Sequence, residues 1–213
     1  MLKKAISYIF PITRKIKSDY SGYFELTVIN GKTLLDTAHA NYSYGSLQRV
    51  LKFSLQQIDL SGINNILLLG LGGGSVIKTL RNDFVYAGNI TAVEIDPVMI
   101  DIAAKEFGII PGNKTLIACG DAFDFVKNNN HFFDLIIIDL FIDNKVPDKF
   151  LYPEFWDNVL KRINKKGSII FNTLCTPDVN IQPVEDNLKQ NGFEYRVYQQ
   201  VEKTNRVLIA NGR

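Results

Sequence analysis

Short apolar runs alternate with amphipathic helical patterns along the chain from about residue 63 onwards. The run at 135–139 is apolar up to its last residue, as expected of a central parallel strand covered on both faces. The pattern predicts strands at 66–69, 90–94, 114–119, 135–139 and 168–172, and helices at 75–81, 97–107, 121–127, 150–163 and 184–190. Strands that alternate with helices indicate βαβ units and a mostly parallel sheet.

Two further strands are predicted at 194–201 and 206–210, and only a polar turn at 202–205 separates them. A parallel pair needs a crossover of roughly a dozen residues, so this pair must be antiparallel. The expected fold is therefore a doubly wound α/β domain with a seven-stranded sheet and an antiparallel C-terminal hairpin.

The first 45 residues follow another pattern. Residues 24–29 alternate between apolar and polar, and Asn30-Gly31 separates them from a second run at 32–35. Asn-Gly between two such runs is the strongest short-range signal for a β-hairpin. A helical pattern then starts at Ser46. We therefore expect an N-terminal β-hairpin element at 1–45 and an α/β domain at 46–213.

Composition narrows the class of protein. Hydrophobic residues make up 46% and charged residues 22% of the 213 residues, which is ordinary for a globular chain and excludes a disordered, collagen-like or coiled-coil protein. The formal net charge is +2, too small to predict a nucleic-acid partner. The apolar runs are shorter than the roughly 20 residues of a membrane span, so no membrane partner and a cytoplasmic location are expected.

The two cysteines, Cys119 and Cys175, stand far apart and form no CxxC motif. They predict neither a disulfide framework nor a metal site, and both are expected to be small buried side chains.

A glycine-rich segment lies directly after the first strand of the α/β domain and opens a helix. It contains Gly70, Gly72, Gly73 and Gly74, and Glu94 ends the next strand. Glycines let a ligand approach the main chain, and a carboxylate at that strand end can accept hydrogen bonds from both hydroxyls of a ribose. The alternative is a tight turn beside a solvated glutamate.

Two nucleotide-type ligands fit such a loop. A dinucleotide site requires Gly-x-Gly-x-x-Gly, but Ser75 occupies the third glycine position, whereas Gly70-x-Gly72-x-Gly74 is intact. Asp121 follows the third strand of the domain and Asp139 ends the fourth. Together these residues resemble the class I methyltransferases that use S-adenosylmethionine (AdoMet), which have a Rossmann-like sheet of this type.

Within that class, four segments resemble the spermidine synthase family. They are Ile66-Leu-Leu-Leu-Gly-Leu-Gly-Gly-Gly, Ala92-Val-Glu-Ile-Asp-Pro-Val-Met-Ile, Gly120-Asp-Ala-Phe-Asp-Phe and Phe133-Asp-Leu-Ile-Ile-Ile-Asp. The resemblance extends over roughly residues 23–175 and includes the aromatic pair Tyr42 and Tyr44.

The resemblance implies a cofactor, either AdoMet or decarboxylated AdoMet, and a role for each matching residue. Glu94 would hold the ribose, with Ile95 beside it, and Asp121 with Ala122 the adenine, while Gly70 to Gly74 would line the methionine-like arm. Asp139 would border the cofactor and act as the catalytic acid that orients and helps to deprotonate an attacking amine, because an amine is nucleophilic only when neutral. The alternative for Asp139 is a helix cap or loop-stabilising acid.

The acceptor half departs from the family pattern. The family places a second acid three residues after its catalytic aspartate, where this chain has Ile142, and Asp143 comes one residue late. Lys145 follows in the same loop, where the family docks a cationic polyamine. Tyr42, Tyr44, Phe141 and Asp143 are the residues predicted to meet the acceptor. The aromatic residues at 141–156 would form either an apolar acceptor pocket or core packing of the next helix.

Three functions stay open. The first is a transferase that methylates a small-molecule acceptor, favoured by the altered loop. The second is a polyamine aminopropyltransferase, favoured by the intact cofactor motifs. The third is a non-catalytic nucleotide-binding or dimerising module, allowed by the incomplete acceptor half. A homodimer is expected from the family alone.

Overall fold

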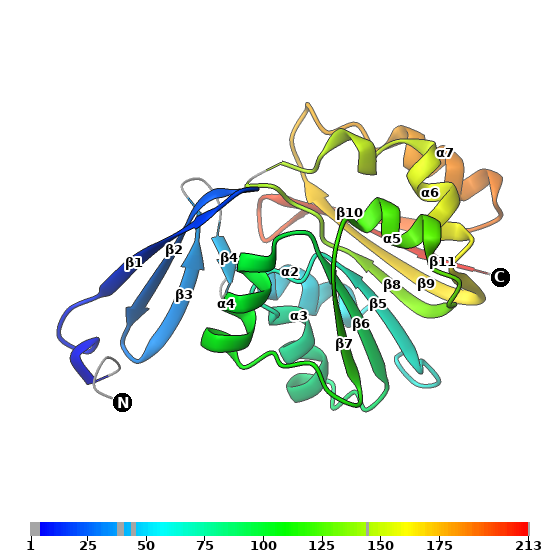
Figure 1. The fold of residues 1–213 in the computed structure, drawn as a ribbon. Helices are drawn as coiled ribbons and strands as arrows, with labels where there is room; N and C mark the ends of the chain where they lie inside the picture. The colour runs from blue at the N-terminus through cyan, green and yellow to red at the C-terminus, as the bar shows by residue number, and fades with distance from the viewer. Residues whose placement is uncertain (1–4, 38–40, 44–45, 144, 213) are drawn as a thin grey trace.

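The protein contains two β-sheets, and its structure, a computed structural model, describes residues 5–37, 41–43, 46–143 and 145–212. The larger sheet has seven strands in the order β10-β11-β9-β8-β5-β6-β7 (Figure 1). Its strands are β5 (Asn65–Leu69), β6 (Asn89–Glu94), β7 (Thr115–Cys119), β8 (Phe133–Ile138), β9 (Ile163–Leu174), β10 (Glu194–Val201) and β11 (Asn205–Asn211).

The direction of the strands confirms the predicted class of fold. β5 pairs in parallel with both β6 and β8, and β8 pairs in parallel with β9. β11 is antiparallel to both of its neighbours, β9 and β10. The chain leaves β5 toward β6 and β7 and then returns to β8 on its other side, so the strand order reverses between β5 and β8. Ligands of open α/β sheets bind beside such a reversal, outside the carboxyl ends of the strands.

Helices cover both faces of this sheet. One face packs against α2 (Ser46–Leu55), α3 (Ser75–Lys78) and α4 (Pro97–Phe107), and the other against α5 (Ala122–Asn128), α6 (Pro153–Leu160) and α7 (Gln182–Gln190). Successive strand residues point to opposite faces, so Ile66 and Leu68 join the first core and Leu67 and Leu69 the second. The result is a three-layer αβα domain.

Two elements differ from the sequence prediction. The helix expected at 150–163 forms only from Pro153 to Leu160, preceded by a 3₁₀ turn, η2 (Asp148–Phe150). Proline favours the first turn of a helix and disfavours helical backbone in the residue before it, so Pro153 sets the start. The helix expected from Ser75 continues after α3 as a π-helical turn, η1 (Thr79–Asp83).

The smaller, N-terminal sheet has four antiparallel strands in the order β1-β2-β3-β4, and is larger than the single hairpin expected. They are β1 (Ile12–Ser18), β2 (Gly22–Ile29), β3 (Lys32–Asp36) and β4 (Asn41–Ser43). The predicted hairpin at Asn30-Gly31 joins β2 to β3, and both turn residues have positive φ, 50° and 72°. β1 was not predicted because it has few apolar residues. It is an edge strand rich in Lys and Arg, a composition that protects exposed edges from further pairing.

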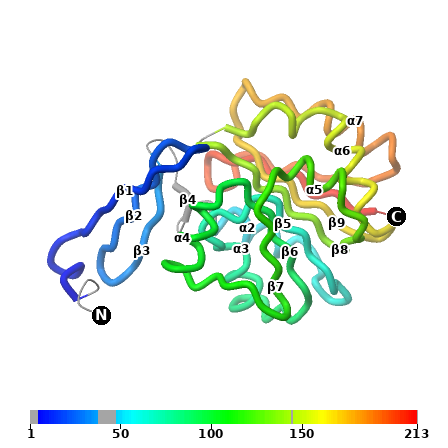
Figure 2. The backbone as a smooth tube through the Cα atoms, viewed as in Figure 1, coloured from blue at the N-terminus to red at the C-terminus, as the bar shows by residue number. Residues whose placement is uncertain are grey.

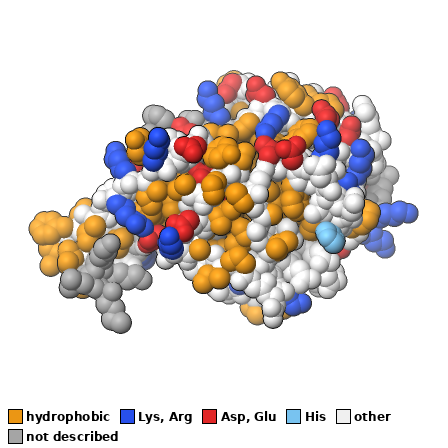
Figure 3. Space-filling model, viewed as in Figure 1, with side chains coloured by type: hydrophobic (Ala, Val, Ile, Leu, Met, Phe, Trp, Pro, Cys, Tyr) orange, Lys and Arg blue, Asp and Glu red, His pale blue; other side chains and the backbone are white. Residues whose placement is uncertain are grey.

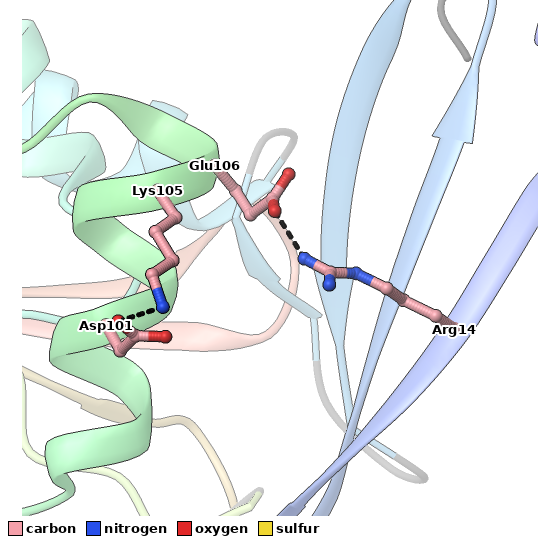
Figure 4. A network of polar contacts seen from close by, with 4 residues as sticks. All are labelled: Arg14, Asp101, Lys105 and Glu106. Carbon is pink, nitrogen blue, oxygen red and sulfur yellow. Dashed lines mark hydrogen bonds and ion pairs between the residues drawn. The ribbon is translucent and has the colours of Figure 1, made fainter.

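The N-terminal sheet is attached to the larger domain beside α4. Figure 2 shows β1–β3 extending away from the seven-stranded sheet, with their near ends against α4. Arg14 of β1 forms an ion pair with Glu106, while Asp101 and Lys105 pair along α4 at 2.8 Å (Figure 4). Phe24 and Leu35 of the small sheet are buried in the same core as α2–α4, so the attachment also has an apolar part.

Several large hydrophobic side chains are exposed at the surface. Hydrophobic side chains gather across the middle of the face drawn in Figure 3. Leu116 on edge strand β7 is 58% exposed, and Cys119 on the same strand is also exposed, contrary to the buried position expected. Cys175 is partly exposed, and both thiols are free. Of the helices in the described ranges, none has the length and apolar character needed to span a membrane.

Candidate functional site

A cavity of about 310 Å³ opens at the carboxyl ends of the parallel strands, where the strand order reverses. The residues after β5, β6, β7 and β8 form its inner wall, and the turn between β1 and β2 contributes to its outer side. From the predicted cofactor site it is lined by Gly70, Gly72, Glu94, Ile95, Asp121, Ala122 and Asp139. The topology thus brings together residues that are up to 69 positions apart, from Gly70 to Asp139.

The glycine loop is shaped by close contacts within the protein. Gly70 has φ +94°, and a Cβ at that position would lie 2.1 Å from the carbonyl oxygen of Asp139. The loops after β5 and β8 therefore cross at a distance that only glycine permits. Gly73 and Gly74 are buried, and a Cβ on Gly74 would lie 2.4 Å from Cγ1 of Ile109. Gly74 therefore serves packing, whereas Gly70 and Gly72 border the cavity.

Glu94 is a partly buried carboxylate at the end of β6. The backbone N–H groups of Leu71 and Gly72 both donate to its Oε2 at 3.1 Å, and the N–H of Asp96 donates to Oε1 at 3.1 Å. Burial raises the pKa of Glu94 above its ordinary value, while these three hydrogen bonds oppose the rise. The arrangement holds the side chain against the glycine loop and at the cavity wall.

Asp139 is partly buried at the end of β8, where it borders the cavity. Its N–H donates to the carbonyl of Leu69 at 2.8 Å, and Nδ2 of Asn172 donates to its Oδ1 at 2.9 Å. Burial raises the pKa of Asp139 to about 6; the Asn172 hydrogen bond lowers it and the nearby charge of Glu94 raises it. Asp139 caps no helix in the described chain, and a pKa near neutrality is suited to proton transfer.

Asp121 lines the cavity but already has partners. Its Oδ1 accepts a hydrogen bond from the N–H of Phe123 at 2.7 Å, which makes it the N-cap of α5. Its Oδ2 forms an ion pair with Lys149, which comes from the loop after β8. An ionised carboxylate has about four acceptor positions, so it can accept one more donor from a ligand.

The acceptor side is partly apolar. Phe141, Ile142 and Asp143 line the cavity, together with Tyr20 and Ser21 from the turn between β1 and β2.

Asp143 accepts a hydrogen bond from Oγ1 of Thr37 at 2.5 Å and has φ +54°. Of the predicted aromatic pair, Tyr42 lies in β4 but its side chain is outside the described residues, as is all of Tyr44. The positions of these two side chains relative to the cavity therefore stay predictions.

Some of the aromatic residues after Asp139 line the cavity and others pack in the core, so both predicted roles occur. Phe141 and Phe150 border the cavity, whereas Phe155 and Trp156 are fully buried in the core under α6. Tyr152 is 56% exposed and belongs to neither group.

The structure adds residues that the sequence did not single out. Asp96 is buried, caps α4 and accepts a 2.5 Å hydrogen bond from Oγ of Ser18, at the end of β1. Asn172 contacts Asp139 from β9, and Asn205 lines the cavity from β11. Only Asn172 carried a usable signal, a polar residue inside an otherwise apolar strand. Across the described ranges, His, Cys, Asp and Glu form no cluster that could bind a metal ion.

The chain is similar in sequence to two kinds of transferase. A polyamine aminopropyltransferase from Vibrio vulnificus (strain CMCP6) is 32% identical over 114 residues, which is 52% of this chain and 38% of that protein. An eEF1A lysine and N-terminal methyltransferase from Danio rerio is 28% identical over 144 residues, 59% of this chain and 20% of that protein. The chain thus spans well under half the length of these two relatives.

Solved structures show the same fold. A probable spermidine synthase from Corynebacterium glutamicum ATCC 13032 superposes with a TM-score of 0.74 at 18% identity, covering 94% of this chain and 80% of that one. The family model of the spermine/spermidine synthase domain matches residues 49–204. The match includes the glycine loop, Glu94, Asp121 and Asp139, and the chain belongs to the spermine/spermidine synthase domain family.

Proposed function

We propose that this protein is a transferase that uses AdoMet or decarboxylated AdoMet. The observation that carries the proposal is the placement of Glu94 and Asp139 on one cavity, next to a glycine loop that approaches both. The residues present suit such a ligand. A sulfonium is cationic, and the cavity has carboxylates at its wall, while glycines without side chains leave room beside the main chain.

Each cofactor-binding residue has a part that follows from its position. Glu94 would accept hydrogen bonds from the ribose hydroxyls, with Ile95 packing beside it. Asp121 and Ala122, at the start of α5, would meet the adenine, and Gly70 and Gly72 the methionine-like arm. Gly74 would hold that loop against Ile109, with Gly73 buried beside it. When bound, AdoMet or its decarboxylated form supplies an electrophilic carbon next to a positively charged sulfur.

Asp139 would act on the acceptor. With a pKa of about 6 it is mostly ionised at pH 7, yet close enough to neutrality to take a proton from an attacking group. Asp139 lies beside Gly70, so it would stand next to a methionine-like arm bound along the glycine loop. Orienting the acceptor there would supply the positioning that a displacement reaction requires.

The first candidate reaction is methyl transfer to a small-molecule acceptor. Ile142 stands where the family has a second acid, and it lines the cavity together with Phe141. This apolar wall opposes a polycationic acceptor. Lys145, the cation expected there from the sequence, is not among the residues that line the cavity, and the cation that does line it, Lys149, is paired with Asp121. A protein could be the methyl acceptor instead of a small molecule, because relatives named as eEF1A lysine and N-terminal methyltransferases are similar to this part of the chain.

The second candidate is aminopropyl transfer to a polyamine. Asp143, although one residue late, does line the cavity and could face an ammonium group. We further propose a cytoplasmic location, in keeping with two free thiols, and a homodimer, as expected from the resemblance.

Calorimetric titration with AdoMet, S-adenosylhomocysteine, decarboxylated AdoMet, methylthioadenosine and NAD tests the proposal. Preference for AdoMet and S-adenosylhomocysteine supports methyl transfer. Preference for decarboxylated AdoMet and methylthioadenosine means that the site rejects the amino-acid carboxylate, and supports aminopropyl transfer. Binding of NAD alone overturns the proposal. Binding of none of them overturns it and leaves the non-catalytic module.

A further inference from the structure

A row of polar side chains runs from Asp139 through the sheet to the turn that precedes β11. Nδ2 of Asn172 donates to Oδ1 of Asp139 at 2.9 Å. Nδ2 of Asn205 donates to Oδ1 of Asn172 at 3.0 Å, and Oγ1 of Thr204 donates to Oδ1 of Asn205 at 2.9 Å. Asn172 lies on β9 and Asn205 on the adjacent β11, so the row crosses from one strand to the next.

The side chains of this row are buried, and burying polar groups lowers the stability of the fold unless they form hydrogen bonds. Asn172 is 0% exposed and Asn205 7%, and Asn172 follows the apolar residues 169–171 of its strand. A buried amide is tolerated only when its hydrogen bonds are satisfied, and an apolar residue would suit the position better if packing alone mattered. Both amides form hydrogen bonds with their neighbours in the row, and the row ends at Asp139.

The row has a direction. An amide side chain offers an oxygen on one side and an NH₂ on the other. Because Asn205 donates to the oxygen of Asn172, the NH₂ of Asn172 must face Asp139. Thr204 in the same way holds the oxygen of Asn205, so the NH₂ of Asn205 faces Asn172. An ionised carboxylate only accepts hydrogen bonds, so the row presents to Asp139 the group that favours its charged form.

Other charges near the cavity do not replace this contact. Glu94 faces Asp139 from β6 and opposes its ionisation. The remaining charged residues that line the cavity have partners elsewhere: Asp96 with Ser18, Asp143 with Thr37, and Asp121 with Lys149. Among the described residues, Asn172 is therefore the side chain that the structure places on the carboxylate of Asp139 as a donor.

We propose that Asn172, held in one orientation by Asn205, is a positioning residue that fixes the carboxylate of Asp139 and keeps it ionised for the transfer reaction. The catalytic consequence rests on the proposed function, but the effect on Asp139 itself does not. Loss of the Asn172 donor should raise the pKa of Asp139, while loss of Asn205 should act less strongly by freeing Asn172 to turn.

The test is an NMR titration of the side-chain carboxyl carbons in the ligand-free full chain, with the Asp139 signal assigned from the Asp139→Asn variant. Asn172→Leu, which keeps the branching at Cγ and removes the amide, should raise the titration midpoint of Asp139 by about one pH unit, the size expected for one charge-assisted hydrogen bond. Asn205→Leu should raise it by less. Thr173→Val is the matched control, because Thr173 is buried next to Asn172 on β9 but does not contact Asp139.

An unchanged Asp139 midpoint in folded Asn172→Leu overturns the proposal. If that variant does not fold, Asn205→Leu decides in the same way, since it leaves Asn172 in place. A raised midpoint together with no binding of AdoMet-type ligands would retain the positioning role and remove the proposed function. Where turnover is measurable, the acidic limb of kcat should move to higher pH in Asn172→Leu and stay in place in Thr173→Val.

Discussion

The surroundings of Asp139 disfavour its ionised form, so ionisation of this residue lowers the stability of the fold. Its pKa in the folded protein is about 6, above the ordinary value for aspartate. A carboxyl with a raised folded pKa contributes stability that is fully present below its ordinary pKa and is lost as pH rises through the folded value. The ionised Asp139 carboxylate therefore lowers the stability of the folded protein at pH 7, and this loss largely disappears near pH 4.

Asp139→Asn should stabilise the protein at neutral pH, because it removes a buried charge and keeps the shape. We expect a gain of roughly 1–3 kcal/mol in the free energy of unfolding at pH 7, from a pKa raised by about two units. Urea unfolding at pH 7 and pH 4 measures the effect. The difference between variant and wild type should shrink at pH 4, and a difference independent of pH would contradict this account.

The same substitution should abolish most of the turnover while sparing the cofactor. A general base typically contributes about 10²- to 10⁴-fold to a rate, and we expect a loss of kcat of that order in Asp139→Asn with little change in the calorimetric affinity for AdoMet. In the wild type, kcat/KM should rise with pH through about 6 as Asp139 ionises. Unchanged turnover in the variant would remove Asp139 from the mechanism.

At the level of elements, the crossing of two loops fixes the site. Gly70→Ala should place a methyl group against the carbonyl of Asp139 and force the loops after β5 and β8 apart. We expect a loss of several kcal/mol in unfolding free energy and a weaker AdoMet affinity. Gly108→Ala is the matched control, since Gly108 also has positive φ, +69°, but nothing lies within 4 Å of its added Cβ.

The control separates backbone strain from the steric clash. Gly108→Ala should cost only about 1 kcal/mol, the usual penalty for a left-handed residue, and leave AdoMet binding unchanged. Chemical denaturation and calorimetry on the two variants measure both effects. Equal losses in the two would mean that the close approach of Gly70 to Asp139 has no energetic weight.

Elements with a strong local pattern were predictable from sequence. α4 forms at 97–107 as expected, because Pro97 and the cap Asp96 start it and Gly108 ends it. The limits of local pattern appear at β1, whose Lys- and Arg-rich sequence contains few apolar residues, and at α6, where Pro153 shortens the helix. Such elements depend on their place at an edge or beside a loop, which local periodicity does not encode.

The site was predictable to the extent that it follows from parallel strands. Gly70, Glu94 and Asp139 each follow or end a strand, so their meeting at one edge of the sheet could be expected. The contact between Asn172 and Asn205 could not, because it depends on β11 lying antiparallel beside β9. The hydrogen bond from Ser18 to Asp96 depends on how a second sheet is attached, which no local pattern reveals.

At the level of the whole molecule, the N-terminal sheet lines part of the cavity, with Phe24 of β2 and with the turn between β1 and β2. Oγ of Ser18 accepts hydrogen bonds from the N–H groups of Tyr20 and Ser21 and donates to Asp96, so it joins that turn to α4. Ser18→Ala should loosen the turn, cost roughly 1–3 kcal/mol because the buried Asp96 loses a donor, and lower the affinity for AdoMet-type ligands.

Arg14→Ala provides the comparison, since its ion pair with Glu106 ties the same sheet to α4 but is largely exposed. We expect less than about 1 kcal/mol from it and no change in ligand affinity. Hydrogen exchange of the amides of Tyr20 and Ser21 should accelerate in Ser18→Ala and not in Arg14→Ala. Similar exchange in both variants would show that the turn is held by other contacts.

The insertion of β11 between β9 and β10 also sets an order of events during synthesis. β10 is made before β11, yet within the described sheet β11 is the strand through which it is joined to β9. Until β11 leaves the ribosome, the β10 segment has no place in the sheet and Asn172 has no Asn205 beside it. The hydrogen-bonded row that reaches Asp139 is therefore completed only when β11 has joined β9 in the sheet.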